Sequence, residues 1–302
     1  VARGAWMSRY LFILNPWAGR GTGAKVIQRV MQAATAQGLD YRVTLTARPR
    51  HAMELAHEAA DGYDVVVAVG GDGTVHEVVN GLLAASSGEV TRPLGIVPIG
   101  SGDDFANHLR LPAHSIEKCV ARIAQGEPRR VDIGRVNGEY FANEVGLAFE
   151  AYVTAESRKV TAPVGPLIYL IAIFRSLGSY SLPRLRLRWE GGEVEREMLM
   201  VSVANGHRAG GGMLFAPDAD ARDGLFDVVM ADAMGRGEIL RLLPKVYQGK
   251  HISEEPVTVV RTPWLTVDSN KPLPVQADGE ILALDMRHLE FELLPLRVPV
   301  LG

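Results

Sequence analysis

The chain has 302 residues, and its 32 Lys and Arg against 35 Asp and Glu give a formal net charge of −3. With 47% hydrophobic and 22% charged residues, it has the composition of a folded globular protein, and its length favours two domains over one. The charge balance argues against a nucleic-acid-binding surface. The single cysteine, Cys119, excludes an internal disulfide and a four-thiolate zinc site, and it fits a reducing cytoplasm.

No segment is predicted to span a bilayer. The longest uncharged stretch near the middle of the chain covers the 15 residues 160–174 and contains two prolines, whereas a spanning helix needs about 20 apolar residues. The segment Val1–Trp6 has neither an apolar core nor a cleavage pattern. We interpret it either as the product of an alternative start or as a remnant of cloning, and leave it outside the predicted domains.

The first part of the chain, up to about residue 124, alternates short apolar runs with helical periodicity. Strands are predicted at 10–14, 41–45, 64–69 and 94–97, and helices at 26–36, 51–60, 75–85 and 115–124. This alternation predicts an α/β domain whose parallel sheet is covered on both faces. Ligands bind such sheets where strands end, so the loops after Leu14, Val69 and Val97 are the candidate sites.

The character of the sequence changes after about residue 127. Asn137-Gly138 is a strong hairpin signal, and further strand-like runs follow to the end of the chain. They are expected at 131–136, 140–145, 184–190, 198–203, 226–230, 257–260, 264–267, 273–276 and 289–300, with helical insertions at 167–177 and 238–247. The second part is therefore predicted to be mostly antiparallel β-sheet.

The first candidate loop, from Asn15 to Gly23, is rich in glycine and lies between a strand and a helix, where backbone amides can approach a phosphate. It is not a Walker A loop, because it closes with Ala24-Lys25-Val26. It also lacks the acid that a dinucleotide fingerprint places at the end of the next strand. When this loop is considered alone, a simple strand-to-helix turn explains it equally well.

The second candidate loop is Gly70-Gly71-Asp72-Gly73-Thr74, between a buried strand and a helix. Two glycines admit a close backbone approach, and Thr74 is expected to cap the helix. Asp72 is then an acid beside a phosphate site. The alternative, an Asp-Gly turn with a helix cap, does not explain the two preceding glycines.

The motifs together resemble the bacterial diacylglycerol kinase-like lipid kinases, which are related to sphingosine and ceramide kinases. Five motifs occur in the family's order over nearly the whole chain. They are Asn15-Pro16 with Gly19; 70–74 with Glu77 and Asn80; 98–106, which includes Gly100-Ser101-Gly102-Asp103; Asp220 to Leu225; and 276–280, which includes Asp278-Gly279-Glu280.

The resemblance implies an α/β domain that binds ATP, of the NAD kinase and diacylglycerol kinase type, at residues 7–127 with a strand returning at about 289–302. It also implies a mostly antiparallel β-sandwich domain for the lipid at 128–288, with the nucleotide in the cleft between the two. The implied nucleotide-binding residues are Asn15, Gly19, Arg20, Thr46, Gly70, Gly71, Asp72, Gly73, Thr74, Glu77, Gly100 and Ser101.

The resemblance also implies roles in catalysis and metal binding. Glu280 would be the general base and Asp72 a second catalytic acid, while the carboxylates of Asp220 and Asp223 and the carbonyl of Leu225 would hold a structural magnesium ion. By residue pattern alone, the 220–225 segment is better explained as an Asp-rich turn. Asp103 stands where most members have Asn, which adds a charge near the phosphates.

The implied activity is an ATP- and Mg²⁺-dependent lipid kinase that phosphorylates a hydroxyl of diacylglycerol or a similar lipid. An NAD kinase-like enzyme and a non-catalytic lipid-binding regulator are the alternatives. We expect a cytoplasmic protein that meets its lipid at a membrane surface, with a homodimer left open. The apolar positions of the 167–177 helix, which are Leu167, Leu170, Ile171, Phe174 and Leu177, form either core or an apolar lip for the lipid.

Overall fold

The computed structural model describes residues 8–112, 115–160 and 167–302, and it divides into two compact units. Unit 1 comprises Val1–Val131 with Leu296–Gly302, and unit 2 comprises Asp132–Pro295. The segment Val1–Trp6 and part of the uncharged stretch 160–174 lie outside the described residues.

Unit 1 is built on a parallel sheet, as predicted. Its strands follow the order β4-β3-β1-β2, and the end of the last strand, β13, pairs in parallel with β4 at the other edge. Every residue of β3 is buried, which explains its continuous apolar run. The strands are β1 (Arg9–Leu14), β2 (Asp40–Leu45), β3 (Val65–Gly70), β4 (Leu94–Pro98) and β13 (Glu280–Leu301).

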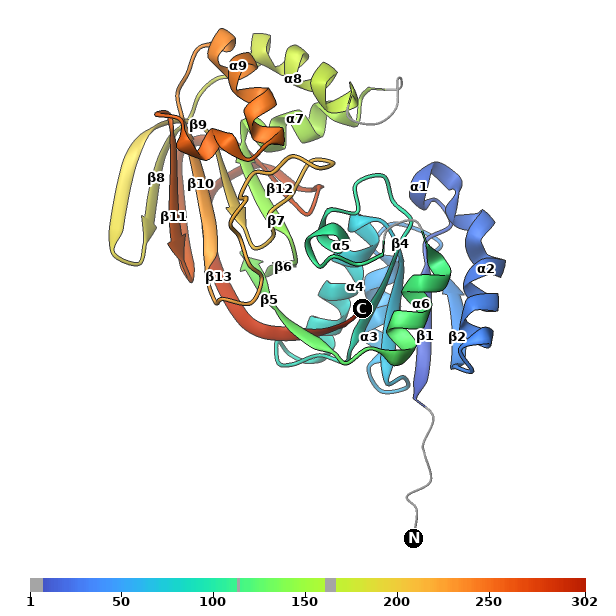
Figure 1. The fold of residues 1–302 in the computed structure, drawn as a ribbon. Helices are drawn as coiled ribbons and strands as arrows, with labels where there is room; N and C mark the ends of the chain where they lie inside the picture. Colours follow the sequence, from blue (N-terminus) through green and yellow to red (C-terminus); the bar gives the residue numbers. More distant parts are fainter. Residues whose placement is uncertain (1–7, 113–114, 161–166) are drawn as a thin grey trace. The chain divides into compact units, whose positions relative to one another are not determined.

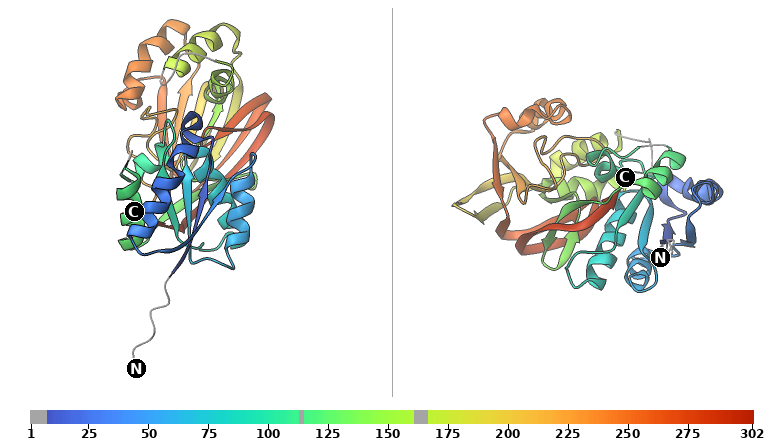
Figure 2. Two further views of the ribbon diagram at one scale, coloured as in Figure 1. Left: turned by 90° about the vertical axis from the view of Figure 1, so that its right-hand side faces the viewer. Right: turned by 60° about the horizontal axis from the view of Figure 1, so that its bottom comes forward.

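Helices cover both faces of this sheet (Figures 1 and 2). Helices α2 (Gly23–Ala36) and α6 (Ile116–Gln125) share one apolar core with alternate residues of β1 and β3. Helices α3 (His51–Ala59) and α4 (Asp72–Ala85) pack against each other and against β1 and β3, respectively. The short helices α1 (Ala18–Gly21) and α5 (Asp104–His108) follow the ends of β1 and β4.

Unit 2 is built on antiparallel strands, again as predicted. The path runs β11-β10-β9-β7-β12-β13, with β8 paired to β9 and β12, and β5 paired to β6. At the predicted hairpin, Asn137 and Gly138 both have positive φ, 46° and 93°. The strands are β5 (Arg129–Val136), β6 (Glu139–Phe141), β7 (Glu144–Ala148), β8 (Arg184–Trp189), β9 (Gly192–Ala204), β10 (Phe226–Asp232), β11 (Val257–Thr262) and β12 (Trp264–Ala277).

The helices of unit 2 gather at one end of its strands (Figure 1). They are α7 (Phe149–Ser157), α8 (Leu167–Ser179), α9 (Arg236–Tyr247) and the 3₁₀ turn η1 (Lys250–Ser253). Sequence reasoning missed α7 because its start carries no usual signal. The residue before it, Ala148, turns the chain with a φ of 67°, and no side chain caps the helix.

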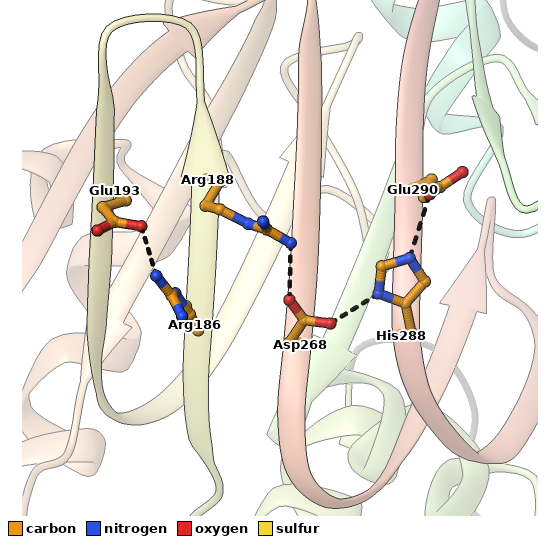
Figure 3. Close-up of polar contacts among 6 residues, drawn as sticks. All are labelled: Arg186, Arg188, Glu193, Asp268, His288 and Glu290. Atoms are coloured by element: carbon orange, nitrogen blue, oxygen red, sulfur yellow. Dashed lines mark hydrogen bonds and ion pairs between the residues drawn. The ribbon is translucent and has the colours of Figure 1, made fainter.

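One face of the unit 2 strands is polar and exposed. On β8, Leu185 and Leu187 point into the core while the intervening arginines face outward. Ion pairs link this face across four strands: Arg186 with Glu193, Arg188 with Asp268, and His288 with both Asp268 and Glu290 (Figure 3). Exposed pairs contribute about 0–1 kcal/mol each, so burial of the opposite face supplies most of the stability.

Candidate active site

The loop after β1 is joined to the loop after β3 by Asn15. Its side-chain amide donates to the Thr74 hydroxyl at 3.2 Å, and its backbone N–H donates to the Val69 carbonyl at 3.0 Å. At the next strand end, the backbone N–H of Thr46 donates to the Leu14 carbonyl at 2.9 Å. The carboxyl ends of β1, β2 and β3 therefore meet at one edge of the sheet, as in other parallel sheets that bind ligands there.

The loops after β3 and β4 touch backbone to backbone. A Cβ on Gly100 would lie 2.6 Å from the Cα of Gly71, and a Cβ on Gly71 would lie 3.0 Å from the Cα of Gly100. The backbone N–H of Ile99 also donates to the Gly70 carbonyl at 3.0 Å. Glycine is required at these two positions because a side chain on either would separate the loops.

The 14-residue helix α4 begins at this junction. Its N-cap is Gly71, in an extended conformation, and no side-chain hydrogen bond caps the helix. The expected capping role of Thr74 is therefore wrong: its hydroxyl instead accepts from Asn15. A helix N-terminus lined by glycines presents backbone N–H groups to an anion, so these residues fit the phosphates of a nucleotide.

Three acids lie at the same edge. The backbone N–H of Phe105 donates to Asp72 at 3.2 Å, and the backbone N–H of Gly100 donates to Asp103 at 3.0 Å. Asp103 and the neighbouring Asp104 are both buried. Burial, and then the charge of Asp72, raises the pKa of Asp103 to about 7. Sequence reasoning did not select Asp104, although its place beside Asp103 after a glycine loop was a usable signal.

The remaining predicted residues of unit 1 have different surroundings. Both carboxylate oxygens of Glu77 accept backbone N–H groups, from Arg50 at 2.8 Å and Ala52 at 3.0 Å, so Glu77 holds the start of α3. Ser101 is exposed in the loop after β4. The backbone of Arg20 lies in α1, and its side chain is outside the described structure.

In unit 2, the predicted base Glu280 follows the turn between β12 and β13. Its side chain is about half exposed and accepts a hydrogen bond at 2.7 Å from Arg158, which also donates to the Gly279 carbonyl at 3.0 Å. Arg158 was not found from the sequence, because it lies at the end of a helix that the sequence did not predict.

Asp278 fixes the other side of this turn. Its carboxylate accepts backbone N–H groups from three successive residues, Ala142, Asn143 and Glu144, at 2.8–3.0 Å. Asp278 also has a positive φ of 49°. Three hydrogen bonds to one carboxylate make the turn a rigid support for Glu280.

The 220–225 turn has the oxygen donors that Mg²⁺ prefers, but arginines engage them. Arg222 donates to both carboxylate oxygens of Asp220, at 3.0 and 3.2 Å. Arg261 pairs with Asp223, which also accepts the backbone N–H of Leu225. Within the described ranges, no group of three or more His, Cys, Asp or Glu side chains is arranged to hold a metal. Magnesium would have to displace these arginines before it could bind at this turn.

Comparison with known proteins defines the class of enzyme. Residues 9–136 match the diacylglycerol kinase catalytic domain, and residues 143–302 match the YegS C-terminal NAD kinase beta sandwich-like domain. The chain therefore belongs to the diacylglycerol kinase family, and it is a lipid kinase.

Individual relatives agree with this assignment. The diacylglycerol kinase of Bacillus subtilis is 30% identical over 91% of this chain and 90% of its own length. A protein of Xanthomonas axonopodis named "Probable lipid kinase YegS-like" is 33% identical over 96% and 95%. A solved diacylglycerol kinase structure from Bacillus anthracis has the same fold, with a TM-score of 0.74 at 21% identity over 99% of this chain and 98% of that one. No helix among the described residues is long and apolar enough to span a membrane.

The buried carboxyl of Asp103 predicts a pH-dependent stability. Its native pKa is about 7 against an ordinary value of 3.8, so the native state keeps a proton that the unfolded chain releases, and stability falls as the pH rises from about 4 to about 7. Asp103→Asn should remove this loss and raise the free energy of unfolding at pH 8, by at most about 4 kcal/mol. Urea unfolding of both proteins between pH 5 and pH 8 measures this difference in the free energy of unfolding. A difference between the variant and the wild type that does not grow with pH would contradict the prediction.

Proposed function

We propose that this lipid kinase transfers the γ-phosphoryl group of ATP, with Mg²⁺, to a hydroxyl of diacylglycerol or a similar lipid. The use of ATP as the phosphoryl donor is supported by the contact of Gly71 with Gly100, which leaves the N-terminus of α4 lined by backbone N–H groups. The names of the relatives, diacylglycerol kinase and lipid kinase, support a lipid hydroxyl as the phosphoryl acceptor.

The chemistry assigned to the protein is positioning and proton removal. Bound ATP supplies the phosphoryl group. Glu280 accepts the proton of the lipid hydroxyl. At the same time the hydroxyl oxygen bonds to the γ-phosphorus, and the bond between that phosphorus and the ADP oxygen breaks. Arg158 holds the Glu280 carboxylate in place at 2.7 Å. Asp72 orders the loops after β3 and β4 through the backbone of Phe105.

Two alternatives give different results in one assay. An NAD kinase-like enzyme would phosphorylate a soluble dinucleotide, and a lipid-binding regulator would transfer nothing. Incubating the protein with labelled ATP, Mg²⁺ and a panel of diacylglycerol, ceramide, sphingosine and NAD distinguishes all three. Label in a lipid other than diacylglycerol would correct the substrate, and label in NAD alone would overturn the proposal.

Glu280→Gln should lower turnover by about 100-fold or more, because an amide cannot accept the hydroxyl proton. Asp72→Ala should likewise remove most activity, through loss of order at the phosphate loops. Asp285→Asn is the matched control, since this acid is exposed on the same strand as Glu280. Near-normal turnover of Glu280→Gln, with an unchanged melting temperature, would end the assignment of Glu280 as base.

The metal role of Asp220, Asp223 and the Leu225 carbonyl is a proposal that rests on the resemblance. Asp220→Ala with Asp223→Ala should lower the melting temperature through loss of the arginine pairs alone. The metal role predicts more: Mg²⁺ should raise the melting temperature of the wild type without nucleotide and not that of the double variant. If Mg²⁺ changed the melting temperatures of the two proteins equally, the segment would be a turn that the arginine pairs stabilise and not a metal site.

We also propose that α8 contacts the membrane surface that presents the lipid. Its two faces differ: Ala172 and Ile173 are buried, whereas Phe174 is 54% exposed and is followed by the exposed Arg175. An exposed aromatic ring beside a cation is suited to the boundary between acyl chains and head groups. We therefore propose that the side of the helix with Phe174 forms the apolar lip for the lipid, and that the side with Ile173 belongs to the core.

Replacing Leu170 and Phe174 by Ser should reduce turnover on diacylglycerol in vesicles more than on a short-chain soluble analogue, because the variant loses surface contact and keeps its chemistry. Ile173→Ser is the matched control, and it should instead lower the melting temperature and affect both substrates alike. Equal losses on both substrates for the double variant, with a lower melting temperature, would show that these side chains only stabilise the fold.

A further inference from the structure

A second group of acids lies inside unit 2, next to the turn that carries Glu280. Glu144, on β7, is 3% exposed, and Glu150, in the first turn of α7, is 9% exposed. Buried carboxyl groups are costly unless they are protonated or well paired. The proposed phosphoryl transfer uses neither of them, so their presence calls for a separate explanation.

The contacts of Glu144 lead directly to the catalytic turn. Its two carboxylate oxygens accept hydrogen bonds at 2.6 Å from the Ser202 hydroxyl and from the side-chain amide of Gln276. The side-chain oxygen of Gln276 in turn accepts the backbone N–H of Gly279 at 2.7 Å. Gly279 directly precedes Glu280, so one chain of hydrogen bonds joins the buried acid to the residue that carries the base.

Glu150 lies against the same amide. One of its oxygens is 3.4 Å from the Gln276 nitrogen, and the other is buried with no hydrogen-bond partner among the described residues. The strand beneath makes room for this group: a Cβ on Gly146 would lie 2.5 Å from the Glu150 carboxyl carbon and 2.6 Å from the Gln276 nitrogen. Glycine in the interior of a buried strand is thus explained by the acid that lies over it.

We propose that Glu144 and Glu150 form a buried acid pair that holds one proton and positions Gln276, and through it the turn bearing Glu280. Glu144 is the ionised member, since both its oxygens accept hydrogen bonds, and Glu150, which has one buried oxygen that no donor contacts, carries the proton. Both glutamates are positioning residues. The inference rests on the proposed function for the role of Glu280.

The electrostatics support this division. Burial raises the pKa of both groups, and for Glu150 the charge of Glu144 raises the pKa further. The groups that face the pair are Ser202 from β9, Gln276 from β12 and the carboxylate of Asp278, which also raises the pKa of Glu144. No cation is among the groups that shift these two pKa values, so a second ionisation would place like charges together without compensation.

The test compares Glu150→Gln, which imitates the protonated acid, with Glu144→Gln, which removes the ionised one. Glu156→Gln is the matched control, from the same helix but paired with Lys159 near the surface. For Glu150→Gln we expect turnover close to wild type near neutral pH, without the alkaline decline that loss of the Glu150 proton causes. For Glu144→Gln we expect turnover to fall about 10- to 100-fold at every pH, with an unchanged KM for ATP.

Two readouts are independent of activity. The native state keeps the Glu150 proton that the unfolded chain releases above about pH 4.5, so the wild type loses stability as the pH rises from there towards the raised native pKa. Glu150→Gln should therefore melt several degrees higher than wild type at pH 8 and at the same temperature near pH 4.5. Amide hydrogen exchange at Gly279 and Glu280 should be faster in Glu144→Gln and unchanged in Glu156→Gln.

The outcomes separate this inference from the proposed function. If Glu150→Gln keeps the wild-type dependence of melting temperature on pH, the pair does not hold the proton and the inference is wrong. If exchange at Gly279 is unchanged in Glu144→Gln, the pair does not position the turn, and the inference is equally wrong. If the wild type phosphorylates no lipid while both structural readouts change as expected, the acid pair stands and the proposed function fails.

Discussion

The proposed phosphate-binding edge of unit 1 depends on the close approach of two backbone segments, at Gly71 and Gly100. Because no side chain separates them, the loop after β4 lies against the loop after β3, and Asp103 can turn back to accept the Gly100 N–H. The same approach places Asp72 where it accepts the Phe105 N–H at the start of α5. An added methyl group at either glycine would disturb the helix N-terminus and all of these bonds together, so the proposed phosphate site and the local fold share one constraint.

In unit 2 the fold fixes the position of an exposed carboxylate, that of Glu280. Glu280 is half exposed and its carboxylate is paired with Arg158, so its position depends on that arginine and on the turn before it. That turn is fixed from two sides, by the three backbone N–H groups on Asp278 and by Gln276 on the Gly279 N–H. Hydrogen bonds one or two residues away thus provide rigidity, while the carboxylate proposed as the base stays exposed.

Much of the fold could be predicted from the sequence because its signals are local. The apolar runs of β1, β3 and β4 and the Asn137-Gly138 turn each follow from a few neighbouring residues. Helix α7 could not be predicted, because it starts after a residue with positive φ that is alanine and not glycine. Two of the missed residues depend on this helix: Glu150 lies on it and Arg158 directly follows it, and both are separated from their partners by more than 120 positions. Contacts over such distances are set by tertiary packing, which leaves no pattern in the neighbouring sequence.

The two proposed sites share a feature that sequence patterns do not show: each has a buried acid beside a second acid. Asp103 beside Asp72 in unit 1 and Glu150 beside Glu144 in unit 2 each have a pKa raised by burial first and by the neighbouring acid second. Such pairs reduce stability near neutral pH, since the native state must keep a proton that the unfolded chain would release. A fold under selection for stability alone would lose them through substitution by amides, which keep the hydrogen bonds and carry no charge. For the pair of Glu144 and Glu150, the proposed role in holding Gln276 and the turn before Glu280 is the requirement that outweighs the stability it costs.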